Sequence, residues 1–365
     1  MIIKTSGALK ILIVEVNWLG DVLFSTPAIK ALRRKFPDSF LACLIVPRVK
    51  QVLEGNPYIN ELIVNDEKGL HSGFWGKLRL AKELRKKKFD LAILFHRSST
   101  RALIAYLAGI PRRVGYATWK RRFLLTDGLP MPKRDSSHRV DYYLDIVKAL
   151  GCDTQDRLYE FFTTEEDVCF ARDFLAAEGI APGDFVVCLN PGGNWFPKRW
   201  PKENFAGLAD KLISGGQAKV VFCGSQNDRE LIADIVSQMS HQPEGSGLPS
   251  DRQSHQPIIA AGRTNLKQLA GIFKRADLVI SGDSGPLHIA ASLGRDIIGL
   301  FGPTSVRVSG PLGRGKIKIM QKDSDCRIPC YDKDCRDNLC MQKITPEDVF
   351  SEIKDFLAVK KNLSF

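Results

Sequence analysis

The chain has 365 residues, 44% hydrophobic and 26% charged, and at this length a single hydrophobic core usually divides into two domains. No stretch approaches the roughly 18 apolar residues of a membrane span and no signal peptide is recognisable, so we expect a cytoplasmic protein with reduced cysteines. The formal charge of +12 is uneven, because residues 1–150 carry 27 Lys and Arg against 13 Asp and Glu, whereas the rest carry 26 against 28.

The first half of the chain alternates between short apolar runs and helix-like segments. Residues 11–16, 41–46, 61–64 and 91–95 are continuous apolar runs, which are typical of strands buried on both faces of a parallel sheet. Residues 27–36, 74–88 and 100–108 between and after them have helical patterning. This alternation predicts a doubly wound α/β domain.

The same pattern restarts near residue 185. Strands are predicted at 185–189, 220–223, 258–261, 278–281 and 297–301, and helices at 165–178, 202–212, 229–239, 266–275, 286–293 and 346–358. We therefore expect domains at 1–165 and 166–345, with a closing helix in 346–365. Residues 241–257 are polar and rich in Pro, Gly and Ser, which predicts a flexible surface insertion.

Ligands of doubly wound sheets bind where the carboxyl ends of strands meet helix N-termini, and the first such segment is residues 17–21 (NWLGD). Gly20 allows a tight turn, which would project Asp21 beyond the strand. Asp21 is either a cap of the next helix or a general base that takes a proton from a hydroxyl group.

The second segment is NPGGNWFPKRWP at 190–201. Asn190 ends a predicted strand, Gly192 and Gly193 let backbone N–H groups approach a ligand, and Lys198 adds a positive charge, which suits a diphosphate. The alternative is a solvated basic loop with Trp200 packed on the core.

The third segment is SGDSGPLH at 281–288, where a strand end leads into a helix start. Ser284 and Gly285 lead into the helix, and the exposed N–H groups of the helix start, together with the helix dipole, favour an anion. Asp283 and His288 flank this turn. The alternative is a buried turn in which Asp283 or Ser284 is only a helix cap.

Cofactor and metal motifs are weak in this chain. No G-x-G-x-x-G follows the first strand, which argues against a dinucleotide-dependent oxidoreductase. Cys326, Cys330, Cys335 and Cys340 lack the C-x₂-C spacing usual for zinc, so free thiols are favoured over a metal or redox site. We therefore expect neither a cofactor nor a metal.

Basic clusters supply the positive charge of the first half, among them 85–88, Arg112, Arg113 and 120–122, which begins with Lys120. Each cluster by itself is consistent with solvated helix ends and loops. The asymmetry as a whole predicts a polyanion or an anionic surface on this half, and nucleic acid, acidic lipid and a phosphorylated sugar are all open at this point.

Three long segments resemble glycosyltransferase family nine, the bacterial heptosyltransferases. They are LGDVLFSTPAIKALRRKFP at 19–37, NPGGNWFPKRWP at 190–201 and AGRTNLKQLAGIFKRADLVISGDSGPLHIAASLGRDIIGLFGPT at 261–304. Within the family, the KRWP segment and the cysteine-containing tail are most similar to the second heptosyltransferases. Asp228 stands where the family usually has Glu, and the insertion at 241–257 is unusual.

The resemblance implies a GT-B fold, with two Rossmann-like domains facing a cleft, the acceptor on the first and the nucleotide sugar on the second. It implies metal-independent transfer of heptose from ADP-heptose with inversion. Asp21 is then the base, Lys198 and residues 284–288 stabilise the departing ADP, and Asp228 and Asp283 lie near the donor.

The acceptor implied by the resemblance is a phosphorylated, lipid-linked oligosaccharide of the lipopolysaccharide core. Such an acceptor accounts for the basic first half without nucleic acid, and it implies an enzyme at the anionic inner surface of the inner membrane. Two alternatives stay open, namely a family member with another glycan or a protein as acceptor, and a non-catalytic nucleotide-sugar-binding protein of the same fold.

Overall fold

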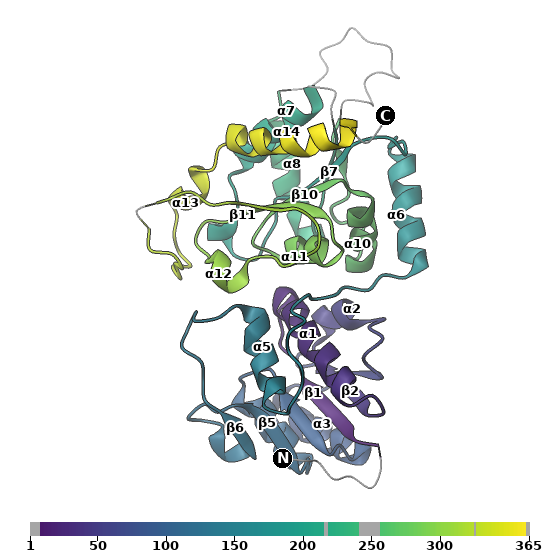
Figure 1. Ribbon diagram of the computed structural model, residues 1–365, viewed down its shortest axis with the longest axis vertical. Helices are drawn as coiled ribbons and strands as arrows, with labels where there is room; N and C mark the ends of the chain where they lie inside the picture. Colours follow the sequence, from purple (N-terminus) through teal and green to yellow (C-terminus); the bar gives the residue numbers. More distant parts are fainter. Residues whose placement is uncertain (1–7, 215–217, 241–255, 325, 363–365) are drawn as a thin grey trace. The chain divides into compact units, whose positions relative to one another are not determined.

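The structure is a computed structural model that describes residues 8–214, 218–240, 256–324 and 326–362. Its contacts divide the chain into two compact units, the first ending at Phe162 and the second beginning at Thr163 (Figure 1). Positions 241–255 of the expected insertion lie outside the described residues. No helix in the described ranges is long and apolar enough to cross a membrane.

Each unit contains a six-stranded sheet in which every pair of neighbouring strands is parallel. In the first unit the order is β3-β2-β1-β4-β5-β6, and in the second it is β12-β11-β10-β7-β8-β9. Both orders reverse direction once, between β1 and β4 and between β7 and β10, which is the Rossmann arrangement. The α/β class predicted from the alternating pattern is confirmed.

The strands are β1 (Lys10–Val14), β2 (Phe40–Ile45), β3 (Glu61–Val64), β4 (Leu91–Leu94), β5 (Arg112–Tyr116) and β6 (Asp127–Leu129), followed by β7 (Val186–Asn190), β8 (Lys219–Phe222), β9 (Ile258–Ile259), β10 (Leu278–Gly282), β11 (Asp296–Leu300) and β12 (Ile317–Met320). The apolar runs predicted as strands coincide with these to within one or two residues. They do so because β1, β2, β4 and β7 are buried on both faces and leave no alternation of polar side chains.

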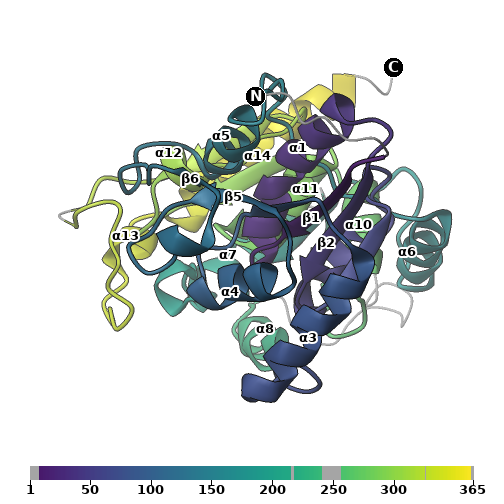
Figure 2. The ribbon, with the colours of Figure 1, turned by 90° about the horizontal axis from the view of Figure 1, so that it is seen from below.

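The helices of the first unit are α1 (Leu19–Lys35), α2 (Lys50–Leu53), α3 (Gly73–Lys87), α4 (Ser99–Leu107) and α5 (Arg139–Lys148). Helix α1 contacts α5, and α3 contacts α4 (Figure 2). Because right-handed crossovers lead outward from β1 in one direction and from β4 in the other, α1 and α4 cover opposite faces of the sheet.

The helices of the second unit include α6 (Glu165–Ala177), α7 (Lys202–Ser214), α8 (Arg229–Ser237), α10 (Leu266–Arg275), α11 (Gly285–Ser292), α12 (Val306–Ser309), α13 (Leu339–Gln342) and α14 (Pro346–Asn362). Helix α14 packs against α7, and its Val349 and Ile353 are fully buried in the core of this unit. The closing helix therefore belongs to the packing of the second unit.

The predicted start of the first helix is wrong. Helix α1 begins at Leu19, eight residues before the predicted start at Pro27, so Gly20 and Asp21 lie in its first turn and not in a loop. Proline 27 is tolerated inside the helix because the Thr26 hydroxyl donates to the Leu23 carbonyl (2.8 Å), the group that an N–H at position 27 would bond.

The strands β5 and β6 and helix α5 were not predicted. Strand β5 begins with Arg112 and Arg113 and therefore lacks an apolar run, so these two residues lie on a strand and not on the solvated helix ends and loops expected of the basic clusters. Helix α5 mixes charged and aromatic residues, but it buries six of its ten residues, among them Tyr142 and Tyr143.

Candidate functional site

The first group of candidate residues lies at the carboxyl end of β1, beside the point where the strand order reverses. Asp21 is the third residue of α1, while Trp18 occupies the N-cap position. The phenol of Tyr143 on α5 donates to Asp21 Oδ1 (3.4 Å). Gly20 precedes Asp21 in the same turn. The half-buried carboxylate of Asp21 is thus anchored to a second helix.

Glu15, which was not predicted as a site residue, lies behind Asp21 and is fully buried. Its carboxylate is contacted by the Ser25 hydroxyl (3.0 Å) and by the Val16 N–H (3.1 Å). Burial raises the pKa of the Glu15 carboxyl to about 8, against the lowering effects of Ser25, Val16 and Arg101. The only sequence signal was a charged residue at the end of an apolar strand.

Arg101 fixes the backbone between β1 and α1. This buried guanidinium donates to the Glu15 carbonyl (3.1 Å), to Asn17 Oδ1 (2.7 Å) and to Glu67 (2.8 Å). At the end of the neighbouring strand, burial together with the positive charges of Arg101 and Arg121 lowers the pKa of His96 to about 4. The imidazole of His96 is therefore neutral at pH 7.

The basic candidates of the first unit have different environments. Arg112 pairs with Asp127 (3.2 Å), and Arg113 donates to the Leu124 carbonyl (2.6 Å). Arg121 is fully buried and donates to the Tyr116 carbonyl (2.7 Å). Only Lys120 and Arg122 of the 112–122 cluster are exposed. Three of the five cations therefore serve the internal structure of the unit.

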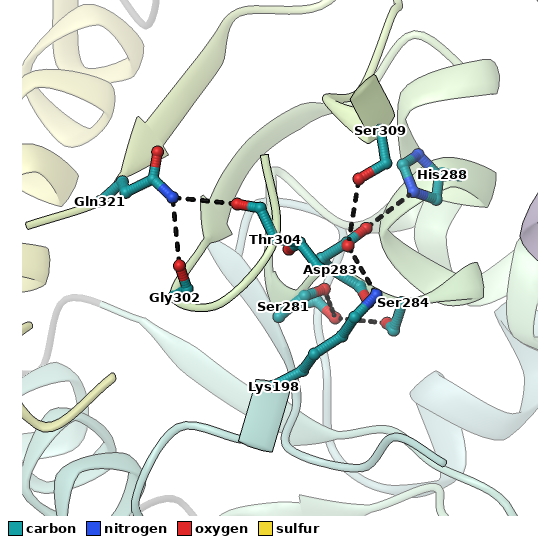
Figure 3. A network of polar contacts seen from close by, with 10 residues as sticks. Lys198, Ser281, Asp283, Ser284, His288, Gly302, Thr304, Ser309 and Gln321 are labelled. Carbon is teal, nitrogen blue, oxygen red and sulfur yellow. Dashed lines mark hydrogen bonds and ion pairs between the residues drawn. The ribbon is translucent and has the colours of Figure 1, made fainter. Parts of the chain in front are cut away.

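In the second unit, Lys198 and Asp283 form an ion pair (2.7 Å) although they are 85 residues apart (Figure 3). Lys198 ends a short 3-10 helix, η3 (Phe196–Lys198), after β7, and Asp283 follows β10, so the pair spans the second reversal of strand order. Asp283 Oδ1 also contacts His288 Nε2 on α11 (3.4 Å), and Oδ2 accepts from Ser309 (3.2 Å). The structure thus brings together three residues predicted from separate motifs or motif ends.

The charge state of Asp283 follows from this pairing. Burial raises the pKa of its carboxyl, but the hydrogen bond with His288 and the positive charge of Lys198 outweigh burial and hold the pKa well below its usual range. Asp283 is therefore ionised, and Lys198 lies beside a fixed negative charge with its own side chain still partly accessible. An anion that enters here meets a lysine that is already oriented.

Asn190 and Ser284 form a second group of hydrogen bonds in this site. The Asn190 amide donates to Ser281 (3.0 Å) and to Ser284 (3.4 Å), and the two serine hydroxyls are 2.9 Å apart. Ser284 occupies the N-cap position of α11, without a side-chain bond to the helix, and Gly285 is the first helical residue. The first N–H groups of α11 lie beside Asp283 as a result, at the end where the helix dipole favours an anion.

Asp228 and the paired glycines connect the loops after β7 and β8. The Asp228 carboxylate caps a 3-10 helix, η4 (Gln226–Asp228), by accepting from Ser225. A Cβ atom placed on Gly192 would lie 2.4 Å from Asp228 Oδ1, so only glycine fits against this carboxylate. Gly193 has open space around it, and its carbonyl accepts from Arg199 (2.8 Å). Trp200 is buried, as the alternative for this loop proposed, and donates to the Ile344 carbonyl (2.8 Å).

Two further polar residues near this group, Gln321 and Thr304, were not singled out in the sequence. Gln321 donates to the carbonyls of Gly302 (3.3 Å) and Thr304 (3.0 Å) and so holds the loop after β11 (Figure 3). The hydroxyl of Thr304 is buried and has no hydrogen-bond partner in the described part of the chain. In the sequence, Gly302–Thr304 follows the end of a predicted strand, and this position could have indicated that the segment belongs to the site.

Among the described residues, no three His, Cys, Asp or Glu side chains are grouped so that they could hold a metal ion. The four tail cysteines are present as free thiols. Burial raises the pKa of the Cys340 thiol, and the neighbouring thiols of Cys326 and Cys335 raise it further.

Comparison with known proteins agrees with these features. Residues 77–340 match the model of glycosyltransferase family 9 (heptosyltransferase). Lipopolysaccharide heptosyltransferase 2 of Salmonella typhimurium is 27% identical over 96% of this chain and 99% of that protein.

Solved structures agree as well. A family 9 glycosyl transferase from Veillonella parvula aligns with a TM-score of 0.82 and 29% identity, covering 96% of this chain and 97% of that one. The structure of E. coli ADP-heptose lps heptosyltransferase II aligns with a TM-score of 0.77 and 24% identity over 97% and 100% of the two chains, which supports the GT-B fold.

Proposed function

The chain belongs to glycosyltransferase family 9, the heptosyltransferases, and from this premise we propose that it transfers heptose from ADP-heptose to a phosphorylated acceptor of the lipopolysaccharide core. The observation that carries the proposal is the Lys198–Asp283 ion pair beside the N-terminus of α11. A preoriented cation and a helix N-terminus are the features that bind a diphosphate and stabilise it as it leaves.

The proposed reaction is a single displacement with inversion. The Asp21 carboxylate takes the proton of an acceptor hydroxyl, the hydroxyl oxygen attacks the anomeric carbon, and the bond from that carbon to the β-phosphate oxygen of ADP breaks. The negative charge that develops on the ADP oxygen is stabilised by Lys198 and by the first turn of α11. Asn190, Gly192, Gly193, Asp228, Ser284 and His288 shape the donor site, and no metal enters any step.

We place the acceptor on the first unit, whose positive charge exceeds its negative charge. Lys120 is an exposed candidate contact, whereas Arg112 and Arg113 contribute through the field of the unit because their side chains have internal partners. The same field favours a cytoplasmic enzyme that associates peripherally with an anionic membrane.

Transfer assays with two variants test this function. With ADP-heptose and a phosphorylated core acceptor, the wild type should release ADP. Asp21→Asn should lower turnover by roughly 10²–10⁴ without loss of ADP affinity, and Lys198→Ala should lower turnover by roughly 10² or more. Lys202→Ala, which removes a half-exposed lysine at the start of α7 that pairs with Asp234 (3.3 Å), is the control and should behave as wild type.

The measurements are initial rates of ADP release and ADP affinity by calorimetry. Absence of transfer from ADP-heptose to any core acceptor would refute the proposed function. Normal turnover of Asp21→Asn would instead show that the carboxylate is not the general base. Its role would then be structural, as in its contact with Tyr143.

A further inference from the structure

The first unit carries exposed aromatic side chains among lysines on one side of its sheet. Phe74 is 67% exposed and Trp75 79% exposed at the start of α3, and Phe123 is 78% exposed in the 3-10 helix η2 (Arg122–Leu124). The rings of Phe74 and Trp75 pack against each other (5.3 Å between centroids). Large aromatic rings are usually buried within a protein, so a group of exposed rings indicates an interaction surface.

Helix α3 is basic and amphipathic. Its core face is formed by Gly76, Leu80, Ala81 and Leu84. The opposite face carries Trp75, Arg79, Lys82 and Lys86, which follow one another at intervals of four, three and four residues and therefore form one stripe along the helix. The apolar face of α3 packs on the protein, so this stripe presents an aromatic ring and a row of cations to solvent, where cations are attracted to anionic headgroups.

Most of this charge has no partner inside the protein. Lys77, Lys82 and Lys86 make no side-chain hydrogen bond or ion pair with any residue that the structure describes, and Arg79 pairs only with Glu83 on the same helix (3.2 Å). Between 73 and 88 the chain has seven Lys or Arg and a single acidic residue. The excess of positive charge on this helix favours an anionic partner.

The side chains of two arginines join α3, α4 and η2 into one surface. Arg85 Nη2 at the end of α3 donates to the Leu107 carbonyl at the end of α4 (2.6 Å). Arg113 donates to the Leu124 carbonyl of η2 (2.6 Å) and lies 5.3 Å from the ring of Tyr106 on α4. Helices α3 and α4 lie side by side (Figure 2).

The outward side of α4 bears apolar and aromatic groups. Leu103 and Tyr106 are exposed there, one helical turn apart, and Arg122 lies over the neighbouring Phe123 ring (4.7 Å). Aromatic rings placed beside cations suit the interface between lipid headgroups and acyl chains, where the rings enter the apolar layer and the cations meet phosphates.

We propose that the surface formed by α3, α4 and η2 docks on a bilayer of anionic phospholipids, with Phe74, Trp75 and Phe123 entering the headgroup layer and Arg79, Lys82 and Lys86 binding lipid phosphates. The inference deepens the proposed function, because it assigns the membrane attachment of a lipid-linked acceptor to particular residues, but it does not depend on which sugar is transferred.

Co-sedimentation of the full chain with vesicles tests the proposal. Wild type should bind phosphatidylcholine vesicles that contain phosphatidylglycerol, bind pure phosphatidylcholine weakly, and dissociate as the salt concentration rises. Each basic residue near an anionic leaflet changes affinity by about fivefold, so Arg79→Gln, Lys82→Gln and Lys86→Gln together should lower it by about 100-fold. Phe74→Ser with Trp75→Ser should lower it by about tenfold or more.

Matched variants in the second unit control for charge and for exposed aromatic area. Lys333→Gln, Arg336→Gln and Lys354→Gln remove the same number of exposed charges, and Tyr331→Ser removes an exposed ring. Both controls should bind as wild type. Quenching of Trp fluorescence by brominated lipid measures the depth of insertion. The fraction of fluorescence that is quenched should fall in Trp75→Phe, while vesicle binding persists.

Two outcomes would overturn the proposal: no preference of wild type for anionic vesicles, or equal losses in the α3 and control variants. Preferential binding of a nucleic acid or an acidic protein by the same basic residues, without vesicle binding, would also overturn it. Transfer to a delipidated, water-soluble acceptor separates this test from that of the proposed function. The α3 variants should keep this rate, and a rate of zero in wild type with intact vesicle binding would refute the function alone.

Discussion

At the scale of single residues, Glu15 and Ser25 show how burial decides the state of a carboxyl group. The Ser25 hydroxyl has one proton but faces two acceptors, the Val22 carbonyl (2.8 Å) and Glu15 Oε1 (3.0 Å). A protonated Glu15 satisfies both, because it donates to Ser25 while Ser25 donates to Val22. The groups that bear on Glu15 are Ser25 and Asp21 on α1, Arg101 on α4, Cys43 on β2 and Tyr143 on α5.

Glu15→Gln should therefore stabilise the protein in a pH-dependent way. The folded-state pKa of about 8 lies above the unfolded value of 4.5, so the stability contributed by the neutral acid is fully present below about pH 4.5 and is lost as the pH rises to about 8. Glutamine cannot ionise, so the variant should gain up to about 3 kcal/mol at pH 7 relative to pH 4.

Melting temperatures of wild type and variant across pH 4–9 measure this difference. Glu54→Gln, which replaces a half-exposed carboxylate, is the control and should show little change with pH. A gain for Glu15→Gln that is the same at every pH would mean that Glu15 has the same pKa in the folded and the unfolded protein, so that burial does not raise it.

At the scale of elements, α1 is continuous across Pro27 because Thr26 substitutes for the missing N–H. The Thr26 hydroxyl donates to the Leu23 carbonyl (2.8 Å) and accepts from the Glu160 N–H (3.1 Å), so it also ties the helix to residues near the end of the unit. Thr26 is almost fully buried, and water does not replace these bonds.

Thr26→Val should leave both backbone groups unsatisfied and lower the free energy of unfolding by about 2 kcal/mol or more. Denaturant titration measures the loss. Thr26→Ser keeps the hydroxyl and should lose less. Adding Pro27→Ala to Thr26→Val supplies an N–H for the Leu23 carbonyl and should restore part of the stability. If Thr26→Val and Thr26→Ser are equally destabilised, packing of the methyl group decides the effect and the hydroxyl does not.

At the scale of the whole molecule, the hydrophobic cores belong to separate units. One cluster joins β1, β2, β4, α3 and α4, and another joins β7, β8, β10, α7 and α14. The proposed donor site lies within the second unit, and Glu15 lies within the first. Changes in stability at one site are therefore expected to act mainly on the unit that contains it.

Scanning calorimetry with ADP tests this separation. At 100 times its dissociation constant ADP should stabilise the second unit by about 2.7 kcal/mol and raise its transition, whereas Glu15→Gln should raise that of the first unit at pH 8. Lys198→Ala should reduce the shift caused by ADP. A single transition that responds equally to ADP and to Glu15→Gln would show that the two units unfold together.

The sequence by itself determined the α/β class, most strand positions and the segments at strand ends that contain Asp21, Lys198 and Asp283. Periodicity and apolar runs are local signals, and a strand buried on both faces displays them without reference to the rest of the chain. The same reasoning missed β5, because Arg112 and Arg113 interrupt the apolar pattern while pairing with groups distant in the sequence.

Only the tertiary structure decided which charges are paired, buried or exposed. Lys198 meets Asp283 across 85 residues, Arg121 is buried although its neighbours in the same basic cluster are exposed, and Glu15 is enclosed by residues from four elements. The physical reason is that desolvation and Coulomb energies depend on distances through space. Residue types and their spacing along the chain do not contain those distances until the sheets and helices have packed.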